Sequence, residues 1–148
     1  MQTMNQDDWN YFGGLTDGEG HIGVWVKKSD HYSMGYHVSP IFQIALGEID
    51  KSFLEKWKNE VGGTISPNRR VGYVWRVFDR EQITNLLLNL ESYVRLSSTK
   101  RKIELVKQIL ALHEAHTPTN PEKLRPLVQE LRKLSKRKRN GAIRYWTS

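Results

Sequence analysis

The chain has 148 residues, a length typical of one folded domain. Hydrophobic residues make up 38% of the sequence and charged residues 26%, a balance that excludes gross disorder. There is no cysteine, which excludes disulfides and thiolate metal sites. No apolar run reaches the roughly 18 residues that a membrane helix needs, and the polar first ten residues do not resemble a secretory signal. We therefore expect an intracellular protein without a membrane partner.

The positive charge is concentrated toward the C-terminus. Residues 1–94 contain 9 Lys or Arg and 12 Asp or Glu, a net charge of −3. Residues 95–148 contain 14 Lys or Arg and 4 Asp or Glu, a net charge of +10. The excess of basic residues favours a polyanionic partner such as nucleic acid. On charge alone, a solvated basic helix without such a partner is the alternative.

Hydrophobic periodicity and turn residues predict five helices and four strands. In chain order these are a helix over residues 8–19, strands over 21–29 and 36–46, a helix over 50–61, strands over 64–68 and 72–78, and helices over about 80–93, 99–116 and 121–134. Asp7 or Asp8 is expected to cap the first helix, Asp50 the second and Asp79 the third. Pro40 indicates that the second strand runs along a sheet edge or contains a bulge.

This order of elements, αββαββα with additional C-terminal helices, predicts an α+β fold. The two hairpin-like strand pairs imply an antiparallel sheet with helices on one face. We expect a single domain, with its core over about residues 8–116 and a C-terminal helix and basic tail over about 117–148. The other sheet face would carry basic, polar and aromatic side chains, which can read base edges and phosphates in the DNA major groove. These residues are His21, Trp25, Lys27, His37, Ser39, Gln43, Asn68, Arg69 or Arg70, and Arg76.

The most distinctive segment, residues 12–20, reads FGGLTDGEG. Gly14 and Gly18 are four residues apart and share one helix face, and each costs a helix about 1 kcal/mol against Ala. Close approach of a second helix would offset that cost. Asp17 and Glu19 stand at the helix C-terminus, where the helix dipole disfavours anions, and a bound cation would reverse the penalty. The alternative is a helix that ends in a glycine-rich turn with two solvated acids.

This segment resembles the LAGLIDADG motif of homing endonucleases in its GLxDGEG form. The strand that follows it and the αββαββα order also resemble that family's core, over roughly residues 9–116. The resemblance implies a sheet that forms a DNA-binding saddle and an enzyme that cuts double-stranded DNA. One copy of the motif is recognised here, so the resemblance implies a homodimer joined through the motif helix and a long, nearly palindromic target.

The resemblance also implies roles for individual residues. Glu19 would bind the divalent metal, with the main-chain carbonyl of Gly18 as a further ligand, and Asp17 would be structural, together with Gly14 and Gly18. The expected metal is Mg²⁺, with Mn²⁺ as a substitute and Ca²⁺ supporting binding without cleavage.

Residues 93–102, YVRLSSTKRK, resemble a YPLxTKKR-like stretch whose lysine approaches the active-site water. This implies a catalytic role for Lys100, with Lys102 as the alternative.

DNA contacts are expected from the uncovered sheet face and from the lysine-containing stretch. The residues are Trp25, Lys27, His37, Ser39, Gln43, Asn68, Arg69, Arg70, Arg76 and Arg101. One departure from the family stands at Leu46, where family members often place a glutamine that positions water. His113 and His116 are three residues apart on a helix and form a less favoured metal-site hypothesis.

Three functions are compatible with the sequence. The first is the homing endonuclease, which the acid at Glu19 favours. The second is a non-cleaving member of the same fold, either an intron maturase that binds intron RNA or a DNA-binding regulator, and Leu46 favours this reading. The third is a basic structural protein with a coincidental motif, which predicts neither sequence preference nor metal dependence.

Overall fold

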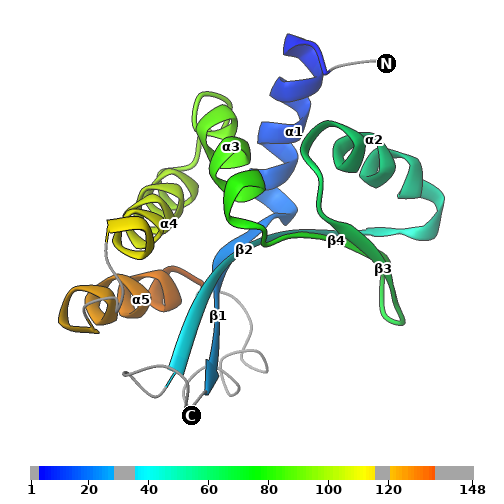
Figure 1. Cartoon of the computed structure of the whole chain (residues 1–148). Coiled ribbons are helices and arrows are strands. Elements are labelled where there is room, and N and C mark those ends of the chain that lie inside the picture. The colour runs from blue at the N-terminus through cyan, green and yellow to red at the C-terminus, as the bar shows by residue number, and fades with distance from the viewer. Residues whose placement is uncertain (1–3, 29–35, 116–120, 136–148) are drawn as a thin grey trace.

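The computed structural model describes residues 4–28, 36–115 and 121–135 (Figure 1). Its elements follow the predicted αββαββα order and add two helices after it. In chain order they are α1 (Gln6–Glu19), β1 (His21–Lys28), β2 (Tyr36–Gly47), the short 3-10 helix η1 (Glu48–Asp50), α2 (Lys51–Val61), β3 (Thr64–Asn68), β4 (Gly72–Val77), α3 (Arg80–Leu90), α4 (Ser97–Ala115) and α5 (Pro121–Ser135). Within the described ranges, no helix is long and apolar enough to cross a bilayer.

The four strands form one antiparallel sheet in the order β1-β2-β4-β3. Figure 1 shows a curved sheet with the helices gathered on one side of it. Pro40 lies opposite Val24 of β1, whereas pairing between β2 and β4 begins only at Phe42. The part of β2 that contains Pro40 therefore has a strand neighbour on one side only, where a missing N–H is tolerated. The α+β fold with an antiparallel sheet, as predicted, is confirmed.

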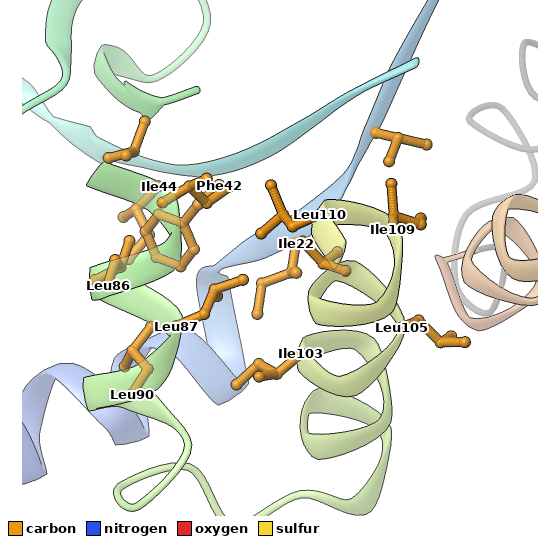
Figure 2. Packing of buried hydrophobic residues seen from close by; sticks show 14 of the residues in the cluster. Ile22, Phe42, Ile44, Leu86, Leu87, Leu90, Ile103, Leu105, Ile109 and Leu110 are labelled. Atoms are coloured by element: carbon orange, nitrogen blue, oxygen red, sulfur yellow. The ribbon is translucent and has the colours of Figure 1, made fainter. Parts of the chain in front are cut away.

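The main core lies between the helices and the sheet. Figure 2 shows side chains from α3, such as Leu87, and from α4, such as Ile103, gathered over the strand residues Ile22 and Phe42. A second group of rings fixes α1 to the sheet and to α2: the ring centroid of Phe12 lies 5.9 Å from that of Phe42 in β2 and 4.7 Å from that of Trp57 in α2. Each fully buried side chain of this size contributes about 1.5–3 kcal/mol. The core therefore holds the end of α1 in a defined position above β1.

Two of the predicted helix caps are wrong, and one is confirmed. Helix α1 is capped by Asn5, whose side chain accepts a hydrogen bond from the Asp8 N–H at 2.8 Å while the Asp8 carboxylate accepts one from the Asn5 N–H at 3.0 Å. Asp50 makes no side-chain cap because η1 runs directly into α2. Asp79 does cap α3, accepting a hydrogen bond from Gln82 N–H at 3.1 Å.

Candidate nucleic-acid interface and metal site

The glycines of the motif segment fall on two different sides of α1. A Cβ atom at Gly13 would lie 2.5 Å from the carbonyl oxygen of Tyr93, so only glycine allows this approach of α1 to the segment after α3. A Cβ atom at Gly14 or Gly18 would have no atom of another described element within 4 Å. Gly13 is thus needed for packing inside the domain, whereas Gly14 and Gly18 line an open face of the helix.

That open face continues toward the start of α1. Tyr11 shares it by helical spacing and has 58% of its surface exposed. The Tyr11 ring lies 6.0 Å from the ring of Phe53 in α2, which is also exposed. We call the surface formed by Tyr11, Gly14, Gly18 and Phe53 the motif-helix face. Two glycines flanked by exposed aromatic rings make a surface that a second helix could approach closely.

Asp17 ties the end of α1 to the beginning of α4. Its Oδ2 atom accepts hydrogen bonds from the backbone N–H of Arg95 at 2.8 Å and of Leu96 at 3.4 Å. Its Oδ1 atom is buried and has no hydrogen-bond partner among the described residues. One oxygen of Asp17 is therefore engaged in hydrogen bonds within the chain.

Glu19 is the last residue of α1, and its side chain is exposed. Within the described part of the chain, no hydrogen bond or ion pair engages this carboxylate, and Gly20 closes the helix by donating its N–H to the carbonyl of Thr16 at 3.0 Å. The last carbonyls of a helix, including that of Gly18, have no partner inside the helix. Carboxylate and carbonyl oxygens are the donors that Mg²⁺ prefers, so Glu19 and Gly18 fit this metal.

A single chain does not complete such a site. The described residues contain no group of three or more His, Cys, Asp or Glu side chains that could hold a metal ion. Mg²⁺ in nucleic-acid enzymes is commonly held by one or two carboxylates together with substrate phosphates and water. The donors around Glu19 fit that arrangement, in which substrate supplies the remaining ligands.

The side chains of the two candidate lysines project from different sides of α4. Residues two apart on a helix point about 200° apart, so Lys100 and Lys102 do not share a face. Burial and the nearby Lys102 ammonium both lower the pKa of His21, which directly follows the motif segment. Lys100 is exposed and forms no ion pair with a described residue. Lys102, the alternative in the sequence analysis, is thus the lysine that acts on the start of β1.

The uncovered sheet face carries an organised row of polar side chains at its centre. The register aligns His21, Gln43, Arg76 and Thr64 across the four strands. The Arg76 guanidinium donates from Nε to Gln43 Oε1 at 3.1 Å and from Nη1 to Ser66 Oγ at 3.3 Å. These hydrogen bonds hold Arg76 in a fixed orientation. Its side chain would therefore lose less conformational entropy on binding a base edge.

The charge on this face has one sign. None of the four strands contains an Asp or Glu, although they include Lys27, Lys28 and Arg76. Arg69 and Arg70 are exposed in the turn between β3 and β4. Asn68 shapes this turn, because its Oδ1 accepts hydrogen bonds from the N–H groups of Arg70 at 2.9 Å and Val71 at 3.2 Å. The curved sheet therefore presents a basic surface suited to a polyanion.

The outer end of β1 carries two more of the expected contacts. Trp25 and Lys27 are exposed, and Trp25 pairs with Ser39 across the strands. Lys27 pairs with His37, but the His37 ring lies 6.0 Å from that of His113 in α4. The His37 ring therefore lies beside the helix layer, whereas Trp25, Lys27 and Ser39 lie on the open face.

Arg101 has a different environment from the one expected. Its guanidinium forms a two-bond contact with Glu130 of α5, Nε to Oε2 at 2.5 Å and Nη2 to Oε1 at 2.8 Å, and lies 3.4 Å from Glu104. The hydrogen bonds that Arg101 donates to Glu130 raise the pKa of Arg101 and lower the pKa of Glu130. The structure therefore places Arg101 in a contact between α4 and α5, not on the sheet.

The structure also places Leu46 and His113, two residues considered in the sequence analysis. Leu46 pairs with Tyr73 and packs against the helix-side core, so it does not lie on the open face where a glutamine could position water. His113 is half-buried beside His37, and burial lowers its pKa. His116 lies outside the described residues, so the hypothesis of a metal site at His113 and His116 stays untested.

One residue of the open face, Phe78, was not predicted from the sequence. It continues the alternation of Val74 and Arg76 past the end of β4, and its ring lies 5.9 Å from that of Trp25. Strand alternation extended by one residue would have placed it there.

The fold and the site together define an α+β protein in which a motif helix presents an acid beside a basic sheet. Residues 12–110 match the family model of the LAGLIDADG endonucleases, and the chain belongs to this family. It is 26% identical over 124 residues to the probable intron-encoded endonuclease 2 of Neurospora crassa, a match that covers 81% of this chain and 27% of that protein. The chain thus spans about a quarter of that curated relative.

Solved structures agree with this assignment. I-SmaMI bound to an uncleaved DNA target in the presence of calcium ions is 27% identical, with a TM-score of 0.72 over 84% of this chain and 44% of that one. The homing endonuclease I-CvuI, in complex with an uncleaved target in the presence of Mg, has a TM-score of 0.77 at 17% identity and covers 95% of this chain and 92% of that one. I-TnaI, also a homing endonuclease, has a TM-score of 0.74 at 18% identity, over 98% of this chain and 95% of that one.

Proposed function

We propose that this chain is a homodimeric, site-specific endonuclease that hydrolyses phosphodiester bonds of double-stranded DNA with a divalent metal held at Glu19. The observation that supports it most directly is the position of Glu19. Its carboxylate is exposed at the end of a helix whose core packing fixes it above a basic sheet, and no described side chain neutralises it. The helix dipole disfavours an anion at the C-terminus of α1, and a bound cation would offset that penalty.

The sheet is proposed to lie in the DNA major groove. Arg76 and Gln43, held together at the centre of the face, would read base edges, while Arg69 and Arg70 in the exposed turn would contact phosphates. Trp25, Lys27 and Ser39 would contact the outer part of each half-site. Arg101 and His37 are not included, because the first is engaged by Glu130 and the second lies against α4.

A homodimer is proposed to form through the motif-helix face. Gly14 and Gly18 leave α1 without side chains on this face, so a second α1 could approach closely and bring two copies of Glu19 together. A two-fold axis there would match a nearly palindromic target. The I-SmaMI match covers less than half of that protein, so a second motif helix within a longer chain is the competing arrangement.

Glu19 and the Gly18 carbonyl would bind the metal together with a non-bridging phosphate oxygen and water. When bound, Mg²⁺ would lower the pKa of the attacking water and stabilise the charge that develops on the phosphate. Lys102, which acts on His21 beside the motif, would offset phosphate charge near the same place. Mn²⁺ is expected to substitute for Mg²⁺, and Ca²⁺ to support binding without cleavage.

The test is selection from a randomised duplex library with purified protein, in Mg²⁺ and separately in Ca²⁺. The proposal expects cut molecules in Mg²⁺ that share one nearly palindromic sequence, and the same sequence retained uncut in Ca²⁺. Sedimentation of the complex would show two chains on one duplex. Cleavage without sequence preference, or one chain per site, would contradict the proposal.

The second candidate is a member of the fold that binds DNA or intron RNA without cutting it. The match to an intron-encoded protein favours an intron-related role, and the described residues contain no group of three or more His, Cys, Asp or Glu that could hold a metal ion by themselves. Leu46 no longer supports this candidate, because it packs against the helix-side core. Selective binding in Mg²⁺ without cutting would favour it.

A further inference from the structure

An apolar patch interrupts the basic sheet face at the outer part of β1. Ile41 is fully buried, yet its side chain belongs to the open face and not to the helix-side core, because its neighbour Phe42 occupies that core. Across the strands Ile41 pairs with Gly23, which adds no side chain over it. Trp25 and Phe78 flank this position with ring centroids 5.9 Å apart. We call Trp25, Ile41 and Phe78 the open-face apolar patch.

The two rings of this patch are exposed to solvent. Trp25 has 44% of its surface exposed and Phe78 has 49%. Exposed aromatic pairs on a binding face are commonly contact points, since their apolar area is still available for burial. The patch lies beside the Arg76–Gln43 pair and in the same strand segment as Lys27 and Lys28, so a polyanion reaching the basic groups would also cover the rings.

We propose that the open-face apolar patch reads the C5 methyl group of a thymine in each half-site. The inference rests on the proposed DNA-binding function and deepens it by naming the base. In the major groove, thymine is the base that presents an apolar group, and the other base edges offer only hydrogen-bonding atoms. Two rings over a buried isoleucine supply an apolar contact for a methyl group and no acceptor for a cytosine amine.

The ring geometry argues against an inserted base. The planes of Trp25 and Phe78 are tilted by 35° and their centroids lie 5.9 Å apart. A base stacked between two rings needs parallel faces about 7 Å apart, twice the roughly 3.4 Å stacking distance of the duplex. The pair therefore presents a surface that contacts groove atoms of an intact duplex.

The position in the half-site follows from strand length. Trp25 is four strand residues beyond His21, about 13 Å at roughly 3.3 Å per residue, and Glu19 lies two residues before His21. Base pairs rise by about 3.4 Å, so the thymine is expected about four to six base pairs from the cleaved bond.

The test replaces single thymines of the selected target by deoxyuridine, which removes only the methyl group. We expect that one such replacement in each half-site, four to six base pairs from the cut, weakens binding about fourfold, the value of one buried methyl group. Replacements elsewhere should leave the dissociation constant within twofold. This measurement uses the unmodified protein and needs no variant to fold.

Variants then assign the effect to the patch. In Trp25→Gln and in Phe78→Gln, binding of the thymine target should fall to that of the deoxyuridine target, so the difference between the two DNAs disappears. Leu88→Gln removes an exposed apolar side chain from α3, on the helix side of the sheet, and should keep the fourfold difference. A selected target without thymine at those positions, or a methyl effect that persists in both patch variants, would overturn the inference. If the library yields no preferred target at all, the proposed function itself fails.

Discussion

The carboxylate of Asp17 accepts a hydrogen bond from the backbone N–H of Arg95 at 2.8 Å, across 78 residues of sequence. Through this bond the end of the motif helix positions the start of α4, the helix that carries Lys102. Asp17→Ala would leave two backbone N–H groups without their acceptor. We expect the free energy of unfolding in urea to fall by about 1–2 kcal/mol. Asp17→Asn keeps an acceptor oxygen and should lose less; equal losses would show that the bond is not the cause.

Gly13 and Gly14 form a matched pair of substitutions. Gly13→Ala places a methyl group against the Tyr93 carbonyl and should destabilise the chain by about 1–3 kcal/mol. Gly14→Ala places it in open space and should stabilise the dilute chain by about 1 kcal/mol through helix propensity. In the proposed dimer, however, Gly14→Ala should weaken self-association. Urea unfolding and sedimentation velocity separate the two effects, and unchanged association in Gly14→Ala would contradict the proposed interface.

Substitution of Lys100 and of Lys102 tests which lysine takes part in DNA cleavage. Lys100→Met and Lys102→Met each remove one positive charge from α4. The two variants should therefore lose similar amounts of long-range attraction to DNA. Lys102→Met is expected to slow cleavage of bound DNA at least tenfold, because its charge acts beside the motif. Lys100→Met should leave that rate nearly unchanged. Single-turnover cleavage measures both, and the reverse order would assign the role to Lys100.

The Arg101–Glu130 contact predicts a pH dependence of stability. The hydrogen bonds and charge of Arg101 hold the pKa of Glu130 below its usual range in the folded chain. The contact therefore stabilises the fold above the unfolded pKa of a glutamate and is lost as pH falls through the lower folded value. The wild-type chain should be more stable than Glu130→Gln at neutral pH, and the difference should vanish in acid. Because both groups are partly exposed, added salt should also reduce it. A difference that persists in acid would contradict this account.

Local patterns predicted most of the fold. Alternation placed Trp75 and Val77 on the buried face and Arg76 on the open one, and the aspartate before α3 was recognisable as its cap. The cap at Asn5 was missed because Asp8 stands in the position where a capping box usually has Glu or Gln.

What the sequence did not predict depends on distant residues. Gly13 and Gly14 are neighbours in sequence, and only the approach of Tyr93 distinguishes their roles. Arg101 looked like a DNA contact because its partner Glu130 lies 29 residues further along, on another helix. The position of Glu19 at a candidate metal site was predictable from the motif, whereas the choice between Lys100 and Lys102 required the packing of α4 against β1.

The central claim, metal-dependent cleavage through Glu19, is tested most directly by comparing wild type with Glu19→Gln on the selected target. The account predicts that cleavage in Mg²⁺ falls by at least a thousandfold, while the dissociation constant for the same DNA in Ca²⁺ changes by less than about tenfold, since the reading face is intact. Glu55→Gln, a matched change on the exposed side of α2, should cut at the wild-type rate. Cleavage by Glu19→Gln at or near the wild-type rate would contradict the assignment of the metal site.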